Sequence, residues 1–164
     1  MDTVKNVVRV GIADMKIVKA PQKIRTSSLG SCVGVVLYDE TTKIAGLVHV
    51  MLPDSSLGRL ESFNRAKFAD TGIYSLVELL KKEGVNPNSL KAKIAGGAQM
   101  FQFGSKDTIR IGPRNIEAVK LVLGRLSIPI IAEDTGGSRG RTIEFDPISI
   151  KLSIRTVNEG TNEI

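Results

Sequence analysis

Short runs of β-branched and aliphatic residues, separated by polar turns, dominate the first third of the chain. Two of these runs, residues 33–38 and 44–51, flank the polar segment 39–43. Side chains of this kind suit a pleated surface that is at least half buried, so the pattern predicts two paired strands. A four-residue loop at residues 39–42 would place Tyr38 opposite Lys43, and Cys32 would then face His49.

Apolar residues at helical spacing predict two helices, over residues 62–83 and 114–126. Lys81, Lys82 and Glu83 before Gly84 are typical of a helix end, and Pro113 suits a first helical turn. Further apolar runs predict strands at 5–12, 23–26, 90–95, 128–133, 142–145 and 149–155. Strands grouped at both ends, with helices between them, favour the α+β class.

The length of 164 residues suits one compact domain, which we expect over residues 1–157, followed by a disordered polar tail at 158–164. No apolar run approaches the roughly 18 residues of a membrane span, so we expect no membrane insertion. The first residues lack the pattern of a signal peptide. A single cysteine cannot form an internal disulfide, and a free thiol suits a reducing compartment, so we expect a cytoplasmic protein.

The formal net charge of +6 raises the question of nucleic-acid binding. Lysine and arginine are scattered along the chain, however, and tryptophan is absent, so platforms on which bases could stack are scarce. We therefore expect no nucleic-acid partner. The positive charge is more simply explained as an aid to meeting an acidic protein surface.

Cys32 and His49 are the only cysteine and the only histidine. In the predicted register their Cβ atoms would lie about 4.5 to 5.5 Å apart, and a loop one residue shorter or longer would make them diagonal neighbours. An imidazole that takes the thiol proton creates the thiolate and imidazolium pair of cysteine acyl-transfer enzymes. Gly30 allows a sharp turn, so the amides of Ser31 and Cys32 could face an oxyanion.

Other readings of these residues stay open. A lone cysteine usually behaves as a small buried apolar side chain, and a lone histidine on an apolar strand is more often a satisfied core residue. A metal site is disfavoured because zinc takes three or four protein ligands, and no further cysteine or histidine exists. The glycine-rich bend at Gly96 and Gly97 would let the backbone approach a ligand or a peptide.

Several segments of the chain resemble, in the same order, those of the chemoreceptor glutamine deamidase family, CheD. These segments are residues 26–32, 46–55, 67–73, 94–101, 111–115 and 134–141. The resemblance covers roughly residues 5–155 and implies layered, sandwich-like sheets with two main helices packed on one side. Family members more often carry an aromatic residue where Arg139 stands, which leaves substrate fit at that edge open.

The resemblance implies that Cys32, His49 and Thr26 are catalytic, with Thr26 orienting the histidine. We expect Ser27, Ser28, Gly30 and Asp54 to border the substrate cleft. The implied reaction is hydrolysis of glutamine side-chain amides on the cytoplasmic domain of methyl-accepting chemoreceptors, without a metal or organic cofactor.

The resemblance also implies a CheC-type phosphatase as a second partner. Two alternatives stay beside this reading. A cysteine and a histidine would serve a protease or thioesterase equally well, and a noncatalytic adaptor could bind the same partners through an inert Cys32.

Overall fold

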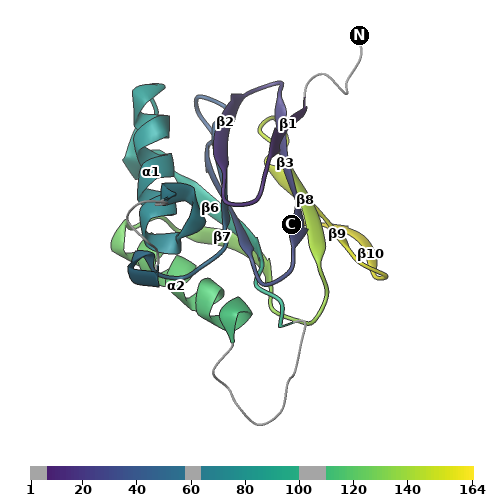
Figure 1. Ribbon diagram of the computed structural model, residues 1–164. Helices are drawn as coiled ribbons and strands as arrows, with labels where there is room; N and C mark the ends of the chain where they lie inside the picture. The colour runs from purple at the N-terminus through teal and green to yellow at the C-terminus, as the bar shows by residue number, and fades with distance from the viewer. Residues whose placement is uncertain (1–6, 58–63, 100–109) are drawn as a thin grey trace.

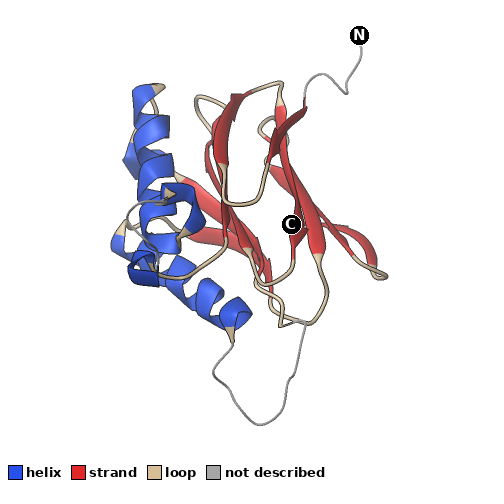
Figure 2. Ribbon diagram, in the orientation of Figure 1, coloured by secondary structure: helices blue, strands red, loops and turns tan. Residues whose placement is uncertain are grey.

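The computed structural model describes residues 7–57, 64–99 and 110–164 and arranges them in three layers (Figure 1). Helices form one outer layer, a five-stranded sheet lies in the middle, and a second five-stranded sheet covers its other face (Figure 2). The expected α+β class, with layered sheets and two main helices on one side, is confirmed.

We call the two sheets the middle sheet and the outer sheet. The middle sheet has the order β2 (Met15–Lys19), β5 (Ile44–Val50), β4 (Val33–Asp39), β6 (Lys91–Gly96) and β7 (Ile130–Thr135). The outer sheet has the order β1 (Val7–Val10), β3 (Lys23–Leu29), β8 (Arg141–Asp146), β9 (Lys151–Thr156) and β10 (Gly160–Glu163). Neighbouring strands are antiparallel except the pairs β1 with β3 and β6 with β7.

The helical layer consists of α1 (Ala69–Lys82) and α2 (Ile111–Arg125), with short 3-10 turns η2 (Ser55–Leu57), η4 (Arg65–Lys67) and η5 (Pro87–Ser89). The predicted start of the first helix at residue 62 lies outside the described residues. The stretch 64–68 is not α-helical, because Asn64 caps η4 and Phe68 is extended. Within the described residues, no helix is long and apolar enough to span a bilayer.

Strands β4 and β5 are buried along their whole length. Helices cover one face and the outer sheet covers the other, which explains why these strands are continuously apolar rather than alternating. Val33, Val35 and Val48 belong to the helix-side core. Val36, Tyr38 and Leu47 belong to a second core between the two sheets.

The register of the β4–β5 hairpin differs from the prediction by two residues. Asp39 pairs with Ile44, so the loop is residues 40–43, and Gly34 rather than Cys32 faces His49. Asp39 stays in the strand because its carboxylate accepts hydrogen bonds from the Thr41 and Thr42 amides. Since side chains alternate with a period of two, Cys32 and His49 still share one face, as diagonal neighbours.

Two further expectations need correction. β2 was not predicted; it is an edge strand that pairs with β5. The segment 158–164 is polar and mostly exposed, but it is not a disordered tail, because β10 pairs with β9 along residues 160–163.

Candidate active site

His49 lies at the end of β5, wholly buried between the sheets. Its Nδ1 atom is 2.8 Å from Thr26 Oγ1, which is also 2.8 Å from the Val10 carbonyl oxygen. A hydroxyl carries one hydrogen and a carbonyl oxygen only accepts, so Thr26 donates to Val10 and accepts from the His49 Nδ1–H. The hydrogen bonds therefore select the neutral tautomer with its lone pair on Nε2.

The His49 Nε2 atom has no hydrogen-bond partner among the described residues, although it is buried. Burial disfavours the charged ring and lowers the pKa of His49 to about 4. At neutral pH the ring is consequently neutral, and its free lone pair is able to accept a proton.

Cys32 directly precedes β4 and is partly buried against the core between the sheets. Cys32 packs on the side of the middle sheet where the His49 ring meets Thr26 of the outer sheet, and it precedes by two positions Gly34, the residue that His49 faces. A Cβ at Gly34 would lie 2.6 Å from Ile143 Cδ1 of the outer sheet, so the two sheets approach closely beside the histidine. Diagonal neighbours of this kind lie about 7 to 8 Å apart, within reach of an imidazole.

Cys32 and His49 both favour their neutral forms. Burial raises the pKa of the Cys32 thiol, and the Cys32 backbone amide beside the sulfur opposes that rise only in part. No hydrogen bond joins the thiol to the imidazole in the described part of the chain. The resting pair is therefore thiol and imidazole, not the ion pair that the sequence suggested, because burial penalises both charges.

Residues 30–32 form a loop that we call the cysteine loop, and all three of its carbonyl groups accept hydrogen bonds. Gly30 O accepts from Ala98 N at 2.8 Å, and Cys32 O accepts from Gly97 N at 2.8 Å. Ser31 O accepts from Asn115 Nδ2 at 2.9 Å. In a trans peptide the carbonyl and the next N–H point in opposite directions, so the Ser31 and Cys32 amides point away from these partners. Within residues 7–57, 64–99 and 110–164, neither amide donates to another residue.

Glycines permit this close arrangement. Gly96 has a φ of 113°, and a Cβ there would overlap the Cys32 carbonyl oxygen. A Cβ at Gly97 would overlap the side chain of Ile116 on α2. The bend at Gly96 and Gly97 thus lies directly against the protein's own chain and holds the cysteine loop in place.

The two serines after Thr26 form an irregularity in β3. Its pairing with β8 shifts between Thr26 and Leu29, which leaves one extra residue in β3. Thr26 and Leu29 are both buried, whereas Ser27 and Ser28 are exposed, and Ser28 has a φ of 61°. This bulge lets Thr26 and Leu29 point to the same interior, which an unbroken strand would not allow.

Asp54 is exposed, and its carboxylate accepts from the Ser56 amide at 2.9 Å. None of its contacts among the described residues reaches Cys32 or His49. Ser55, the next residue, instead binds Asp70 of α1 through its amide and its hydroxyl. The structure therefore anchors this loop to α1.

Two buried polar residues near the cysteine loop were missed in the sequence. Asn115 of α2 binds the loop at Ser31, as described above. Arg141 is paired with Leu29, and its side chain is only 6% exposed. Its Nη2 donates to Asp134 and to the Gly136 carbonyl. No local sequence pattern marks either residue as buried. Both lie in segments that resemble the CheD family, 111–115 and 134–141, and that was the only signal pointing to them.

Arg139, the residue that departs from the family pattern, lies at the surface. Its Nε is 3.1 Å from a carboxylate oxygen of Glu159, and Nη1 donates to the Val157 carbonyl. The side chain is therefore held against the turn between β9 and β10.

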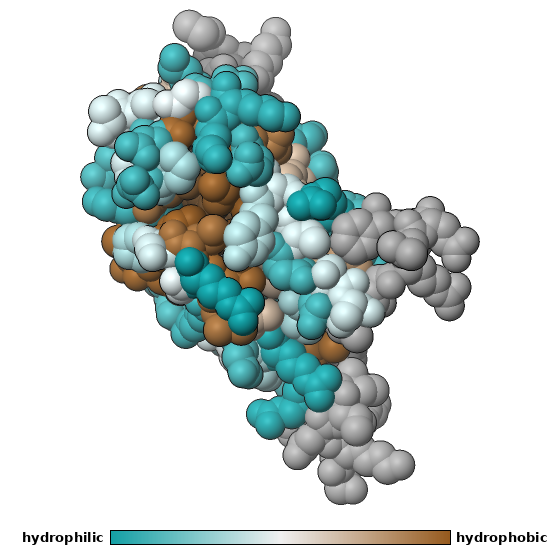
Figure 3. Space-filling model, turned by 90° about the vertical axis from the view of Figure 1, so that its left-hand side faces the viewer, coloured by the Kyte–Doolittle hydropathy of each residue, from teal (hydrophilic) through white to brown (hydrophobic). Residues whose placement is uncertain are grey.

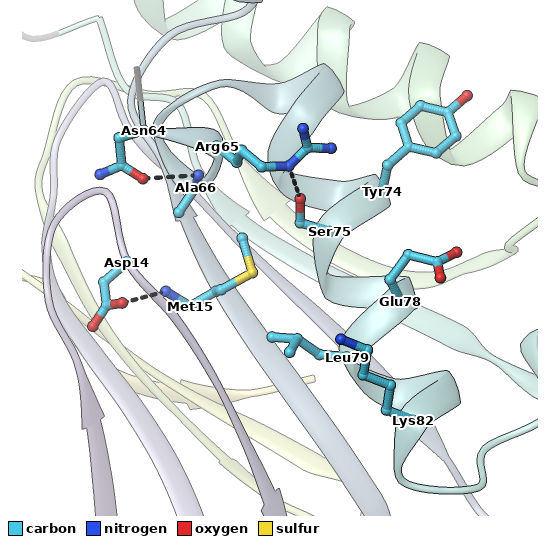
Figure 4. Close-up of a pocket in the computed structure, with 10 residues that line it drawn as sticks. All are labelled: Asp14, Met15, Asn64, Arg65, Ala66, Tyr74, Ser75, Glu78, Leu79 and Lys82. Carbon is cyan, nitrogen blue, oxygen red and sulfur yellow. Dashed lines mark hydrogen bonds between the residues drawn. The ribbon is translucent and has the colours of Figure 1, made fainter. Parts of the chain in front are cut away.

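A cavity of about 470 Å³ lies between β2 and α1 (Figure 4). Its lining includes Met15, Arg65, Tyr74, Glu78 and Leu79. Met15 packs against the helix-side core, so this cavity lies on the face of the middle sheet opposite to Cys32. Figure 3 shows the helical side of the molecule, where apolar side chains gather in a hollow bordered by hydrophilic ones.

The described part of the chain contains no group of three or more histidine, cysteine, aspartate or glutamate residues that could hold a metal ion. Cys32 and His49 alone would offer two ligands. A thiol and an imidazole are groups that can take part in proton transfer and in nucleophilic attack.

Comparison with known proteins gives consistent similarities. A family model described as CheD chemotactic sensory transduction matches residues 51–156. The chain is 60% identical over 160 residues to a chemoreceptor glutamine deamidase CheD of Halalkalibacterium halodurans, covering 97% of this chain and 99% of the relative. It is 56% identical over 159 residues to the protein of the same name from Bacillus subtilis, covering 96% of each.

Among solved structures, a hypothetical protein of Bacillus licheniformis aligns with a TM-score of 0.46 and 17% identity. The alignment covers 74% of this chain and 50% of that one. This similarity is too low to support an argument about fold or activity.

The buried neutral histidine predicts a pH-dependent stability. The pKa of His49 is about 6.5 in the unfolded chain and about 4 in the folded protein. Between these pH values the unfolded chain binds a proton at His49 and the folded protein does not. Stability contributed by the neutral ring is therefore lost as pH falls through that window. Urea unfolding of wild type and His49→Asn should show their difference in unfolding free energy shrinking by about 2 to 3 kcal/mol between pH 7.5 and 4.5. A constant difference would contradict the assignment of a buried neutral ring.

Proposed function

Because the chain belongs to the CheD family of chemotactic sensory transduction proteins, we propose that it deamidates glutamine side chains of chemoreceptors, producing glutamate and ammonia. We propose further that Cys32 is the nucleophile, His49 the general base and acid, and Thr26 the residue that orients His49. The observation that carries this assignment is the Thr26–His49 hydrogen bond, which leaves the Nε2 lone pair free on the face shared with Cys32.

The first step forms a bond between sulfur and the amide carbon. Because both groups are neutral at rest, His49 Nε2 takes the thiol proton as the sulfur attacks, and the carbonyl π electrons move to oxygen. In this proposal the resulting oxyanion accepts hydrogen bonds from the backbone N–H groups of Ser31 and Cys32. Neither N–H group donates to another described residue. The developing imidazolium is stabilised by its Nδ1–H bond to Thr26.

The second step breaks the carbon–nitrogen bond. The protonated Nε2 donates its proton to the amide nitrogen, ammonia leaves, and a thioester to Cys32 remains. A water molecule then attacks the thioester carbon while His49 accepts one of its protons. Return of that proton to the departing sulfur restores the thiol and releases the glutamate side chain.

The partners follow from the same reading. The substrate is a chemoreceptor. The chain has 23 lysine and arginine residues and 17 aspartate and glutamate residues, and this positive net charge suits contact with an acidic protein surface. We place the reaction in the cytoplasm. A CheC-type phosphatase is the second proposed partner. We propose that Ser27, Ser28, Gly30 and Asp54 border the substrate cleft, and Ser27, Ser28 and Asp54 are exposed.

A noncatalytic adaptor is the second candidate function. The observation that favours it is the raised pKa of Cys32 together with the absence, among the described residues, of a hydrogen bond between thiol and imidazole. An adaptor would bind receptors without altering their glutamines, so measurement of the substrate's mass separates the two candidates.

A purified cytoplasmic fragment of a chemoreceptor should gain about one dalton at particular glutamines when incubated with the protein, because an amide NH₂ is replaced by OH. Cys32→Ala should abolish this gain while keeping the unfolding temperature of wild type within a few degrees. Peptide mass spectrometry after proteolysis locates the modified positions. Modification by Cys32→Ala would refute the cysteine assignment, and an unmodified fragment with wild type would favour the adaptor.

Thr26 allows a test of the orienting hydrogen bond with a matched pair of variants. Thr26→Val keeps the shape but removes the acceptor of the Nδ1–H, and we expect kcat to fall about 10- to 100-fold, less than for loss of Cys32 or His49. Thr26→Ser keeps both hydrogen bonds and should stay within a few-fold of wild type. The rate of glutamate formation on the receptor fragment gives both values. Equal activity of the valine variant and wild type would show that Thr26 does not orient the ring.

A further inference from the structure

Asn115 links the two segments that carry Cys32 and His49. It lies on α2, is wholly buried, and donates through Nδ2 to the carbonyl oxygens of Ser31 and Met51, each at 2.9 Å. Ser31 directly precedes Cys32, and Met51 follows His49 by two residues. One side-chain amide therefore holds both segments.

The orientation of this amide follows from its partners. Both are carbonyl oxygens, which only accept, so the group between them must be the NH₂. The other atom of the amide, Oδ1, is buried and has no hydrogen-bond partner within the described residues. A buried acceptor without a partner destabilises the folded state, and the two hydrogen bonds donated by Nδ2 offset that cost.

We propose that Asn115 is a positioning residue for the deamidation reaction, holding the Ser31–Cys32 peptide so that the Cys32 N–H faces the oxyanion. This inference rests on the proposed function and adds a residue to it. Asn115 touches neither the thiol nor the imidazole through any described contact, and it acts through the carbonyl of Ser31.

The peptide between Ser31 and Cys32 depends on Asn115 in a way that its neighbours do not. The carbonyls of Gly30 and Cys32 are held by main-chain amides of Ala98 and Gly97. The Ser31 carbonyl is held by the side chain of Asn115. Without that bond the Ser31 carbonyl has no partner among the described residues, and any rotation of this peptide turns the Cys32 N–H with it.

The bond to Met51 adds a fixed reference point. The Met51 amide donates to the Lys67 carbonyl at 2.8 Å, so this end of the histidine strand is also tied to η4. Asn115 therefore sets the cysteine loop against a segment that is held on its other side. A displacement of about 1 Å in such a site is enough to reduce catalysis strongly.

The test compares Asn115→Asp with Asn64→Asp. The first variant keeps the shape but replaces two donors by a carboxylate oxygen, and we expect kcat to fall about 10- to 100-fold with KM within about threefold. Asn64 makes a similar pair of bonds, from Nδ2 to Ala13 O and from the Ala66 amide to Oδ1, on the helix side of the middle sheet. Its variant should stay within twofold of wild type.

Alkylation of Cys32 by iodoacetamide supplies a readout that needs no substrate. In Asn115→Asp the backbone N–H of Cys32 should turn away from the Cys32 sulfur, so the thiolate is less stabilised. Alkylation at pH 7 should therefore slow several-fold, whereas the plateau rate of alkylation at high pH should stay unchanged. An inactive wild type would refute the proposed function, whereas an unchanged kcat or an unchanged alkylation profile in folded Asn115→Asp would overturn only the role of Asn115.

A second variant and one measurement on wild type cover the case of a folding defect. Asn115→Ser, which retains one donor, should show the same changes at a smaller size, and an unchanged kcat would count against the proposal. If neither variant folds, hydrogen exchange of the Asn115 side-chain NH₂ in wild type decides. Protection relative to the exposed Asn88 is expected, and exchange as fast as that of Asn88 would overturn the proposal.

Discussion

The hydrogen bond from His49 Nδ1–H to Thr26 Oγ1 connects the middle and outer sheets at the point where the proposed chemistry takes place. Because the single hydroxyl hydrogen of Thr26 is donated to Val10, the bond determines which ring nitrogen carries a proton. Burial keeps the ring neutral, and the free lone pair then lies on the face shared with Cys32. The proposed roles of both residues depend on this one tautomer.

The surrounding fold supplies rigidity rather than further charge. The cysteine loop is held by main-chain amides at Gly97 and Ala98 and by Asn115 of α2. Gly96 lets β6 approach the Cys32 carbonyl, and the bulge at Ser27 and Ser28 lets Leu29 face the same interior as Thr26. A hydroxyl in place of a carboxylate beside His49 means that no ion pair is stabilised at rest. In the proposed reaction, proton transfer from the thiol to His49 is therefore coupled to attack on the substrate.

The sequence was sufficient for the features that depend on local pattern. Continuous apolar runs identified β4 and β5, and a register error of two residues left Cys32 and His49 on one face. Asp39 caused that error, since its carboxylate binds the turn amides and keeps it within the strand. The contact between Asn115 and Ser31, 84 residues apart, depends on tertiary packing and has no local signal. The free Nε2 and the pKa of His49 likewise follow from burial between two sheets.

Nitrogen-15 NMR of the imidazole tests the central claim most directly, because the chain contains one histidine and its signals cannot be confused with others. At pH 7 the spectrum should show a protonated Nδ1 and an unprotonated Nε2, and the ring should titrate only as pH approaches about 4. A proton on Nε2 at pH 7, or an imidazolium at that pH, would contradict the account.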